Sequence, residues 1–228
     1  MNPANRNSKS PFENHSAEYD QWFDSESGSA IFSLELGCLK QALEPPMGSW
    51  LEIGVGSGRF ADALGIETGI DPSPTMIAMA AKRGIKASLA FGENLPFEDA
   101  MLDGAIMVCT ICFLDDPSIT LRECHRVIKR DGRLIIGVIP ADSPWGIYHS
   151  QRGKQGHAFY SSARFYTAAE IRMLAESNGF TFQAEHGCIL PKPDDAFFTD
   201  DISRQALREE SFVVLSFIKR NNQGGKQE

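Results

Sequence analysis

Short runs suited to strands alternate with amphipathic segments along most of this 228-residue chain. Five segments are predicted as strands, at 50–54, 68–71, 86–90, 104–111 and 133–139. Segments with helical spacing of apolar residues lie between them, at 59–64, 74–83 and 118–129. The run 104–111 is continuously apolar, as expected of a central parallel strand buried on both faces. This alternation predicts an α/β fold of the doubly wound, Rossmann-like kind.

The two ends of the chain extend this pattern. Residues 16–24 and 30–43 are predicted as helices, and we expect residues 1–44 to form an N-terminal tail and lid helices, the second helix ending at Pro45–Pro46. Near the other end, a helix at 168–177 is followed by two strands at 181–185 and 212–218, which resemble a hairpin. The sequence therefore predicts a mostly parallel seven-stranded sheet with an antiparallel edge strand. The domain would span 45–220, followed by a flexible tail at 221–228.

Residues 140–166 depart from the strand-helix pattern. They lie between the fifth predicted strand and the next helix, and they are rich in aromatic and polar side chains. Ligands of open parallel sheets bind beyond the carboxyl ends of the strands, and this segment leaves the fifth strand at that edge. We therefore predict that 140–166 is an insertion on the substrate side.

Charge and cysteine content narrow the partners and the location. The net charge of −8 argues against nucleic acid as a partner, because an acidic surface repels phosphates. No apolar run approaches the length of a membrane span, so no membrane partner is expected. The first ten residues are polar, and the five cysteines are odd in number and lie mostly in apolar runs. These features are typical of a reduced, cytoplasmic protein, which we expect to be a monomer or a homodimer.

The segment LEIGVGSGRF, residues 51–60, carries the strongest chemical signal. Three alternate glycines follow a strand and precede a helix, so that backbone N–H groups face any ligand over the turn. Arg59 stands where a dinucleotide-binding turn needs its third glycine, which favours a ligand without pyrophosphate. Asp71 ends the second strand, where a carboxylate can accept both hydroxyls of a ribose. The alternatives are a turn that binds nothing, and an Asp71 that only caps the next helix, for which Ser73 is also a candidate cap.

Four segments resemble the successive motifs of the class I S-adenosylmethionine-dependent methyltransferases, and most closely the methyltransferase type 11 group. They are LEIGVGSGRF, GIDPSPTMIAMA, AFGENLPFEDAMLDGAIMV and RECHRVIKRDGRLIIGVI, which together span 50–139, and YDQWF near the N-terminus also resembles the group. The resemblance implies S-adenosylmethionine as the cofactor.

The resemblance also implies a role for each matching residue. The methionine part of the cofactor would be framed by Glu52, Gly54, Gly56 and Gly58. The ribose would be held by Asp71 in the turn with Pro72, and Met76 would pack beside the adenine. The adenine ring would enter the turn of Phe91, Gly92, Glu93 and Asn94. Cys109 and Thr110 would lie under the sulfonium. Many relatives have a small acidic or polar residue where Phe91 and Gly92 stand here, so backbone carbonyls or Glu93 would bind the adenine amino group.

Catalytic candidates come from the segments that flank these motifs. His149 is the best candidate for a general base, and Tyr148 lies beside it, because their segment should border the methyl group. Tyr19, in YDQWF, could form a lid over the cofactor together with Trp22, or the helix could dock its aromatic face on the core. The spacing Cys109-x-x-Cys112 lacks a second pair or nearby histidines, so buried structural cysteines are favoured and no metal site is expected.

These observations predict methyl transfer from S-adenosylmethionine to a small-molecule acceptor by in-line displacement. The sequence CTICFLDDP follows the fourth strand, in place of the NPPY-type element of enzymes that methylate nucleobase amines. Two alternatives stay open. One is a non-catalytic or regulatory protein of the same fold that binds S-adenosylmethionine or S-adenosylhomocysteine. The other is a nicotinamide-dependent oxidoreductase, which Arg59 disfavours.

Overall fold

The computed structural model describes residues 11–43, 48–191, 193 and 208–220. The described residues form one seven-stranded sheet in the order β3-β2-β1-β4-β5-β7-β6. The strands are β1 (Trp50–Ile53), β2 (Thr68–Asp71), β3 (Lys86–Leu89), β4 (Leu102–Val108), β5 (Ile128–Val138), β6 (Phe180–Cys188) and β7 (Phe212–Lys219). The predicted fold class is confirmed. Strand β7 runs antiparallel to both of its neighbours, β5 and β6, at one end of the sheet.

Helices cover both faces of the sheet, as the doubly wound prediction requires. One face carries α3 (Glu26–Leu43), α4 (Arg59–Leu64) and α5 (Pro74–Lys82), and the other carries α6 (Pro117–Val127) and α8 (Ala168–Ser177). Strand β4 supplies both cores, because its side chains alternate. Ala105 and Met107 join the core with α6 and α8, while Ile106 and Val108 join the core with α3.

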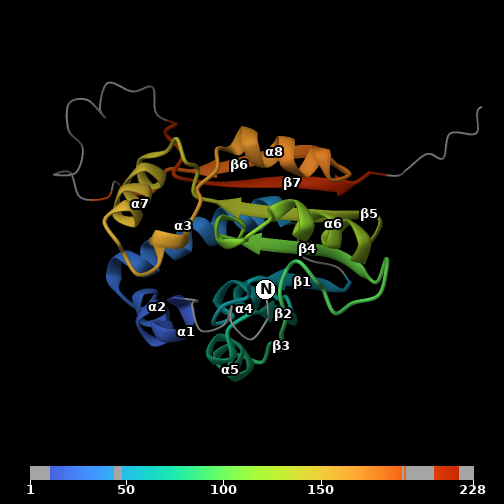
Figure 1. Ribbon diagram of the computed structural model, residues 1–228, viewed down its shortest axis with the longest axis horizontal. Coiled ribbons are helices and arrows are strands. Elements are labelled where there is room, and N and C mark those ends of the chain that lie inside the picture. The colour runs from blue at the N-terminus through green and yellow to red at the C-terminus, as the bar shows by residue number, and fades with distance from the viewer. Residues whose placement is uncertain (1–10, 44–47, 192, 194–207, 221–228) are drawn as a thin grey trace, which may run out of the picture.

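Three further helices lie beyond the carboxyl ends of the parallel strands, at the left of Figure 1. They are α1 (Pro11–Asn14), α2 (Ser16–Trp22) and α7 (Pro144–Lys154). The prediction missed α1, and α3 begins at Glu26 instead of residue 30. The predicted tails at 1–10 and 221–228, and the helix end at Pro45–Pro46, lie outside the described residues.

The segment 140–166 contains a helix that the sequence analysis did not predict. The Ser143 hydroxyl accepts a hydrogen bond from the Gly146 N–H (3.1 Å), and Pro144 occupies the first turn, so α7 begins with a standard cap. A short 3-10 helix, η4 (Tyr160–Ser162), follows it. The Ser-Pro start was a readable signal that the aromatic composition of the segment obscured.

Predicted boundaries around β4 and β5 are wrong. The fourth strand ends at Val108 instead of residue 111, because Cys109 has a φ of 51° and turns the chain into the 3-10 helix η3 (Ile111–Phe113). The helix predicted to reach residue 129 ends at Val127, and β5 begins directly after it. By contrast, α5 starts as predicted, with the Ser73 hydroxyl accepting from the Met76 N–H (3.2 Å).

Candidate functional site

The glycine turn after β1 has the backbone that its sequence predicts. Gly54, Gly56 and Gly58 have φ angles of 73°, 52° and 86°, in the region that side chains disfavour. A Cβ on Gly54 would lie 2.4 Å from the Thr110 side chain, so this position also needs glycine for close packing. A Cβ on Gly56 would meet no atom within 4 Å. The turn therefore packs tightly at Gly54 and leaves its backbone open at Gly56.

Asp71 joins this turn to the end of β2. Its carboxylate accepts one hydrogen bond from the Gly56 N–H and another from the Ser73 N–H, both of 2.9 Å. Burial raises the pKa of Asp71 to about 6. Since Ser73 is the residue that caps α5, Asp71 is not the helix cap. The carboxylate fixes the open part of the glycine turn.

Glu52 lies inside the same end of the sheet. The residue is 2% exposed, and its Oε2 atom has no hydrogen-bond partner among the described residues. Burial raises the pKa of this carboxyl well above its usual range. A buried carboxyl with an unused oxygen is stabilised by a cationic group brought next to it. The glycine turn thus has an unsatisfied acidic group beside it.

The turn predicted to receive adenine follows β3 and is held from α6. The N–H of Asn94 donates to the carbonyl of Phe91 (3.1 Å), which closes the turn, and Glu93 lies half-buried within it. A Cβ on Gly92 would lie 2.9 Å from the methyl group of Thr120. Of the two residues predicted beyond Asp71, Pro72 is half-buried and Met76 is fully buried.

An ion-pair cluster fastens α2 to the glycine turn. Arg59, next to Gly58, pairs with Asp20 (2.7 Å) and Asp24 (2.8 Å). Arg83 pairs with Asp20 (3.0 Å) and also donates to the Ser57 carbonyl (2.9 Å). Although burial acts to raise it, hydrogen bonds from Arg59, Ser57 and Arg83 lower the pKa of Asp20 to about 2. The arginine that replaces a third glycine therefore anchors the N-terminal helices.

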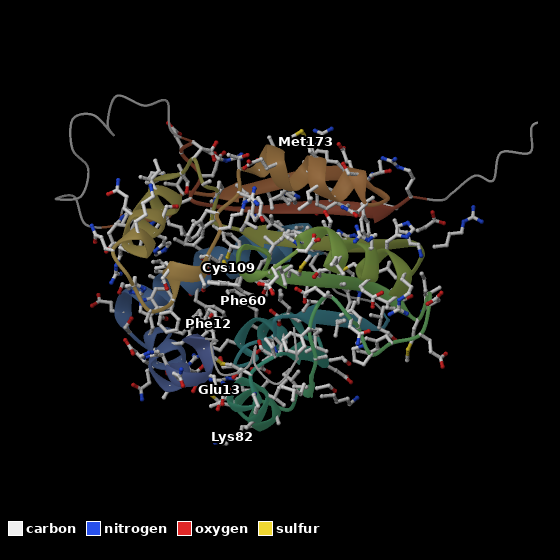
Figure 2. All side chains as sticks on the ribbon, in the orientation of Figure 1. Phe12, Glu13, Phe60, Lys82, Cys109 and Met173 are labelled. Atoms are coloured by element: carbon white, nitrogen blue, oxygen red, sulfur yellow. The ribbon has the colours of Figure 1, made fainter. Side chains whose placement is uncertain are left out.

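Helix α1 adds a second attachment on the other side of the turn. Glu13 accepts hydrogen bonds from the hydroxyls of Ser73 and Thr75, the latter at 2.7 Å. Both residues belong to the start of α5, and Figure 2 shows Glu13 beside that helix. The N-terminal helices are thus attached both to the glycine turn and to the start of α5, and their role as a lid stays a prediction.

A cavity of about 510 Å³ lies between these helices, the ends of β4 and β5, and α7. Aromatic rings dominate its wall: Phe12, Tyr19, Trp22, Phe23, Phe60, Phe113, Trp145, Tyr148, Phe159, Tyr160, Phe165 and Tyr166. Figure 2 shows Phe12, Phe60 and Cys109 gathered where the N-terminal helices face the sheet. Such a volume suits a small molecule, and the wall suits one with an apolar body.

The three predicted catalytic residues all line this cavity. His149 is buried, and its ring lies 4.0 Å from that of Tyr160. Burial, Arg152 and His157 lower the pKa of His149 to about 3, so its ring is neutral. Tyr148 and Tyr19 line the wall as well, and burial raises the pKa of Tyr19 well above its usual range. The structure brings these side chains together; their catalytic roles stay predictions.

Cys109 and Thr110 connect the cavity to the glycine turn. Thr110 contacts Gly54, and its hydroxyl donates to the Val108 carbonyl (3.1 Å). Cys109 and Cys112 both line the cavity, and the Cys112 thiol donates to the Cys109 carbonyl (3.3 Å). The described residues contain no group of three or more side chains suited to holding a metal ion.

Glu35 is an ionisable cavity residue that the sequence analysis missed. It lies on α3, is 6% exposed, and burial raises its pKa to about 8. It occupies the buried face of the helix, one turn after Ile31 and one turn before Leu39. An acidic residue at that spacing inside an apolar stripe was the available signal.

Comparison with known proteins agrees with this architecture. Residues 51–136 match the model of a methyltransferase domain family. A SAM-dependent methyltransferase from Thermotoga maritima, described as a possible histamine N-methyltransferase, shares 33% sequence identity with this chain. Its crystal structure superposes on this one with a TM-score of 0.80, covering 92% of this chain and 98% of its own. The chain belongs to the S-adenosylmethionine-dependent methyltransferases.

Two relatives of this chain are uncharacterized proteins. One, from Methanocaldococcus jannaschii, is 40% identical over 74% of this chain and 80% of its own length. Another, from Mycobacterium tuberculosis, is 40% identical over 78% of this chain. The aligned part is 62% of the length of the mycobacterial protein. No helix among the described residues is long and apolar enough to cross a membrane.

Proposed function

We propose that this protein transfers a methyl group from S-adenosylmethionine to a small molecule held in the aromatic cavity. The end of β4 carries the proposal. Thr110 packs against Gly54 of the glycine turn, and its neighbour Cys109 lines the cavity. The predicted cofactor turn and the cavity therefore meet across two consecutive residues. When bound, S-adenosylmethionine supplies a methyl group activated by the positive charge on its sulfur.

The residues at the turn fit this cofactor. Glu52, with its unpartnered carboxyl oxygen, would hold the cationic methionine end, and the open backbone at Gly56 would let the ligand approach. Asp71 would accept the ribose hydroxyls with the lone pairs that Gly56 and Ser73 leave free. The turn of Phe91, Gly92, Glu93 and Asn94 would take the adenine, and Cys109 and Thr110 would lie under the sulfur.

The N-terminal helices would exclude water and hold the acceptor in line. Methyl transfer needs alignment more than it needs acid or base, and alignment can supply roughly 7–11 kcal/mol in favourable intramolecular cases. The ion pairs of Asp20 and the hydrogen bonds of Glu13 keep α1 and α2 over the site. These contacts would separate the reacting atoms from solvent without any covalent participation by the protein.

The family assignment favours this function over the nicotinamide alternative. The Thermotoga maritima relative is described as a possible histamine N-methyltransferase, which supports a small molecule as the acceptor here. The non-catalytic alternative can be told from the proposal by whether S-adenosylhomocysteine is formed. A binding protein would hold S-adenosylmethionine without forming S-adenosylhomocysteine.

The test combines calorimetry with an assay for product. We expect S-adenosylmethionine and S-adenosylhomocysteine to bind, and NAD to bind at least about a hundredfold more weakly. A screen of metabolite amines, phenols, thiols and carboxylates should then yield S-adenosylhomocysteine with at least one of them. Tight NAD binding with no response to S-adenosylhomocysteine would contradict the cofactor, and binding without product across the screen would favour the non-catalytic alternative.

A further inference from the structure

The cavity contains a carboxyl group, Glu35, that takes no part in the glycine turn or in the contacts that attach the N-terminal helices. Glu35 has no hydrogen bond or ion pair with any described residue, and it is 6% exposed. Burial of an unpaired carboxyl is unfavourable by several kcal/mol if it is ionised. Its helix position is otherwise ideal for an apolar residue, since Ile31 and Leu39 flank it on the same buried face. A ligand that compensates Glu35 has to carry positive charge or donate hydrogen bonds.

The wall around Glu35 is suited to a cation as well. Ring faces attract cations, most strongly where water is excluded. Phe12 and Tyr19 pack edge to face, 5.3 Å apart between ring centres, and the face of Phe23 is covered by the Arg59 guanidinium at 5.4 Å. Phe12, Tyr19 and Glu35 line the same cavity. Aromatic rings and one carboxyl in the same wall form the chemistry that recognises an organic ammonium group.

Among the ionisable residues of the wall, Glu35 is the buried carboxyl. Glu18 also lines the cavity, but its side chain is 75% exposed. Arg152 forms no ion pair with Glu35; its guanidinium lies 5.5 Å from the centre of the Tyr148 ring. Desolvation lowers the pKa of His149 and of His157, which keeps both rings neutral. The interior therefore presents one carboxyl to a ligand.

Glu35 shares the cavity wall with Cys109, the residue that follows β4. It interacts electrostatically with Cys188 on β6 and with Cys109, Tyr19 and Tyr160. Thr110, the neighbour of Cys109, contacts the glycine turn. A nitrogen bound at Glu35 is thus held in the cavity that Cys109 also lines, beside the strand end where the methyl group is expected to enter.

We propose that the acceptor is a compact amine with an apolar body, whose nitrogen is held by the Glu35 carboxyl inside the aromatic cavity. This proposal rests on the proposed function, because it names the acceptor class of the same site. It also assigns Glu35 a role in handling the proton that an amine has to lose.

The proton balance follows from the chemistry of an ammonium group. RNH₃⁺ loses one proton, and the freed electron pair on nitrogen forms the new N–C bond. The C–S bond breaks, its electron pair stays on sulfur, and the products are RNH₂CH₃⁺ and a neutral thioether. The released proton passes to a carboxylate oxygen of Glu35, whose pKa burial raises to about 8. His149, with a pKa of about 3, is a weaker base for this step.

The test uses the full chain without S-adenosylmethionine and two probes that differ in one group, 2-phenylethylamine and 2-phenylethanol. Calorimetry above about pH 8, where Glu35 is ionised and the amine keeps its charge, should show the amine binding at least about tenfold more tightly than the alcohol. Equal affinity for the two probes would overturn the proposal, and this comparison does not depend on any variant.

The matched variants are Glu35→Gln and Glu18→Gln, which remove a buried and an exposed carboxylate from the same wall. We expect Glu35→Gln to weaken amine binding about tenfold or more while alcohol binding stays within about twofold. Glu18→Gln should leave both affinities within about twofold. Unchanged amine binding in a folded Glu35→Gln protein would overturn the proposal.

A parallel titration with S-adenosylhomocysteine separates the two levels of inference. If the wild-type protein binds S-adenosylhomocysteine and shows no preference for the amine, the acceptor class is wrong and the proposed function stands. If it binds the amine through Glu35 and does not bind S-adenosylhomocysteine, the proposed function fails while the amine site remains. Mass analysis of 2-phenylethylamine after incubation with S-adenosylmethionine adds a readout of transfer.

Discussion

The glycine turn and the aromatic cavity lie at the same edge of the sheet and are built in different ways. The turn uses consecutive residues, and its critical feature is backbone conformation, with φ positive at Gly54, Gly56 and Gly58. The cavity uses side chains from three N-terminal helices, two strand ends and the segment 140–166. The glycine turn is formed by residues that are consecutive in the sequence, whereas the cavity is formed by side chains from distant parts of the chain. This difference implies that cofactor and acceptor binding can be disrupted separately.

The largest separation is expected from a matched pair of glycines. Gly56 and Gly65 have φ angles of 52° and 72°, and a Cβ on either would meet nothing within 4 Å. Gly56→Leu and Gly65→Leu should therefore cost similar stability, about 1–2 kcal/mol each for the left-handed backbone. We expect only Gly56→Leu to lower S-adenosylhomocysteine affinity, by about a hundredfold or more, since only this turn faces the predicted ligand.

Calorimetry and thermal unfolding of both proteins check this prediction. Equal losses of affinity in the two variants would show that strain, and not occupation of the ligand site, is responsible. Retained affinity in Gly56→Leu would place the cofactor away from the turn.

The next effect concerns Asp71. Asp71→Ala should weaken S-adenosylhomocysteine binding by about 1.5–3 kcal/mol, because charge-assisted hydrogen bonds to the ribose are lost. The carboxylate also accepts from the Gly56 and Ser73 N–H groups, so the ligand-free protein should lose some stability as well. Asp71→Asn, which keeps one acceptor oxygen for the backbone, is the control for that structural part.

The pKa of Asp71 gives this prediction a pH dependence. Because the ionised form accepts the hydroxyls, affinity should fall as pH is lowered through about 6, where burial places the pKa. Titrations between pH 5 and 8 should show this decline in the wild type and a flatter profile in Asp71→Asn. An identical profile in both proteins would assign the titration to another group.

Much of the turn could be predicted from sequence, because its requirements are local. Three glycines, the acid ending β2 and Ser73 each have a short-range reason to stand where they do. The cavity could be predicted only in outline. The segment 140–166 and Tyr19 do line it, but the positive φ of Cys109 had no sequence signal, and α7 was missed despite its Ser-Pro start.

Glu35 shows why the other parts of the cavity could not be predicted from the sequence. Its place in an apolar stripe marked it as unusual, yet its cavity neighbours Tyr19, Cys109 and Tyr160 come from three other parts of the chain. Only the packing of α3 on the sheet brings them together. Arg59 illustrates the reverse case: the sequence showed that it departs from a dinucleotide turn, and the structure shows that it pairs with Asp20.

The next prediction concerns the ion pairs of Asp20, which attach α2 to the glycine turn. Asp20 has a side chain that is 14% exposed, and its pKa is lowered to about 2. Asp20→Asn should destabilise the protein by about 2 kcal/mol at neutral pH, whereas Glu67→Gln, at an exposed pair with Lys86, should leave the stability almost unchanged.

The stabilisation by Asp20 depends on pH in a defined direction. Its folded pKa lies below the ordinary value of 3.8, so the contribution is present above about pH 4 and is lost as pH falls toward 2. The stability difference between wild type and Asp20→Asn, measured by urea unfolding, should therefore shrink between pH 5 and 3. A difference that stays constant over this range would show that the ion pairs do not stabilise the fold.

The smallest expected effect tests the acceptor side of the comparison. Tyr148 and His149 line the cavity, and neither contributes to the glycine turn. Tyr148→Phe removes one hydroxyl and keeps the ring, so it should lower the rate of methyl transfer or the acceptor affinity by about 0.5–1.5 kcal/mol. His149→Ala removes a ring that packs on Tyr160, and it should act on the same quantities. In both variants S-adenosylmethionine affinity should stay within about threefold, under 1 kcal/mol.

Kinetics and calorimetry on the same preparations test this prediction for Tyr148 and His149 once an acceptor is known. If both variants turn over normally while Tyr19→Phe abolishes activity, the acceptor is bound under the N-terminal helices and 140–166 serves only as an outer wall. That result would move specificity to α2, the helix that Arg59 fastens to the glycine turn, and the two regions would no longer be separable.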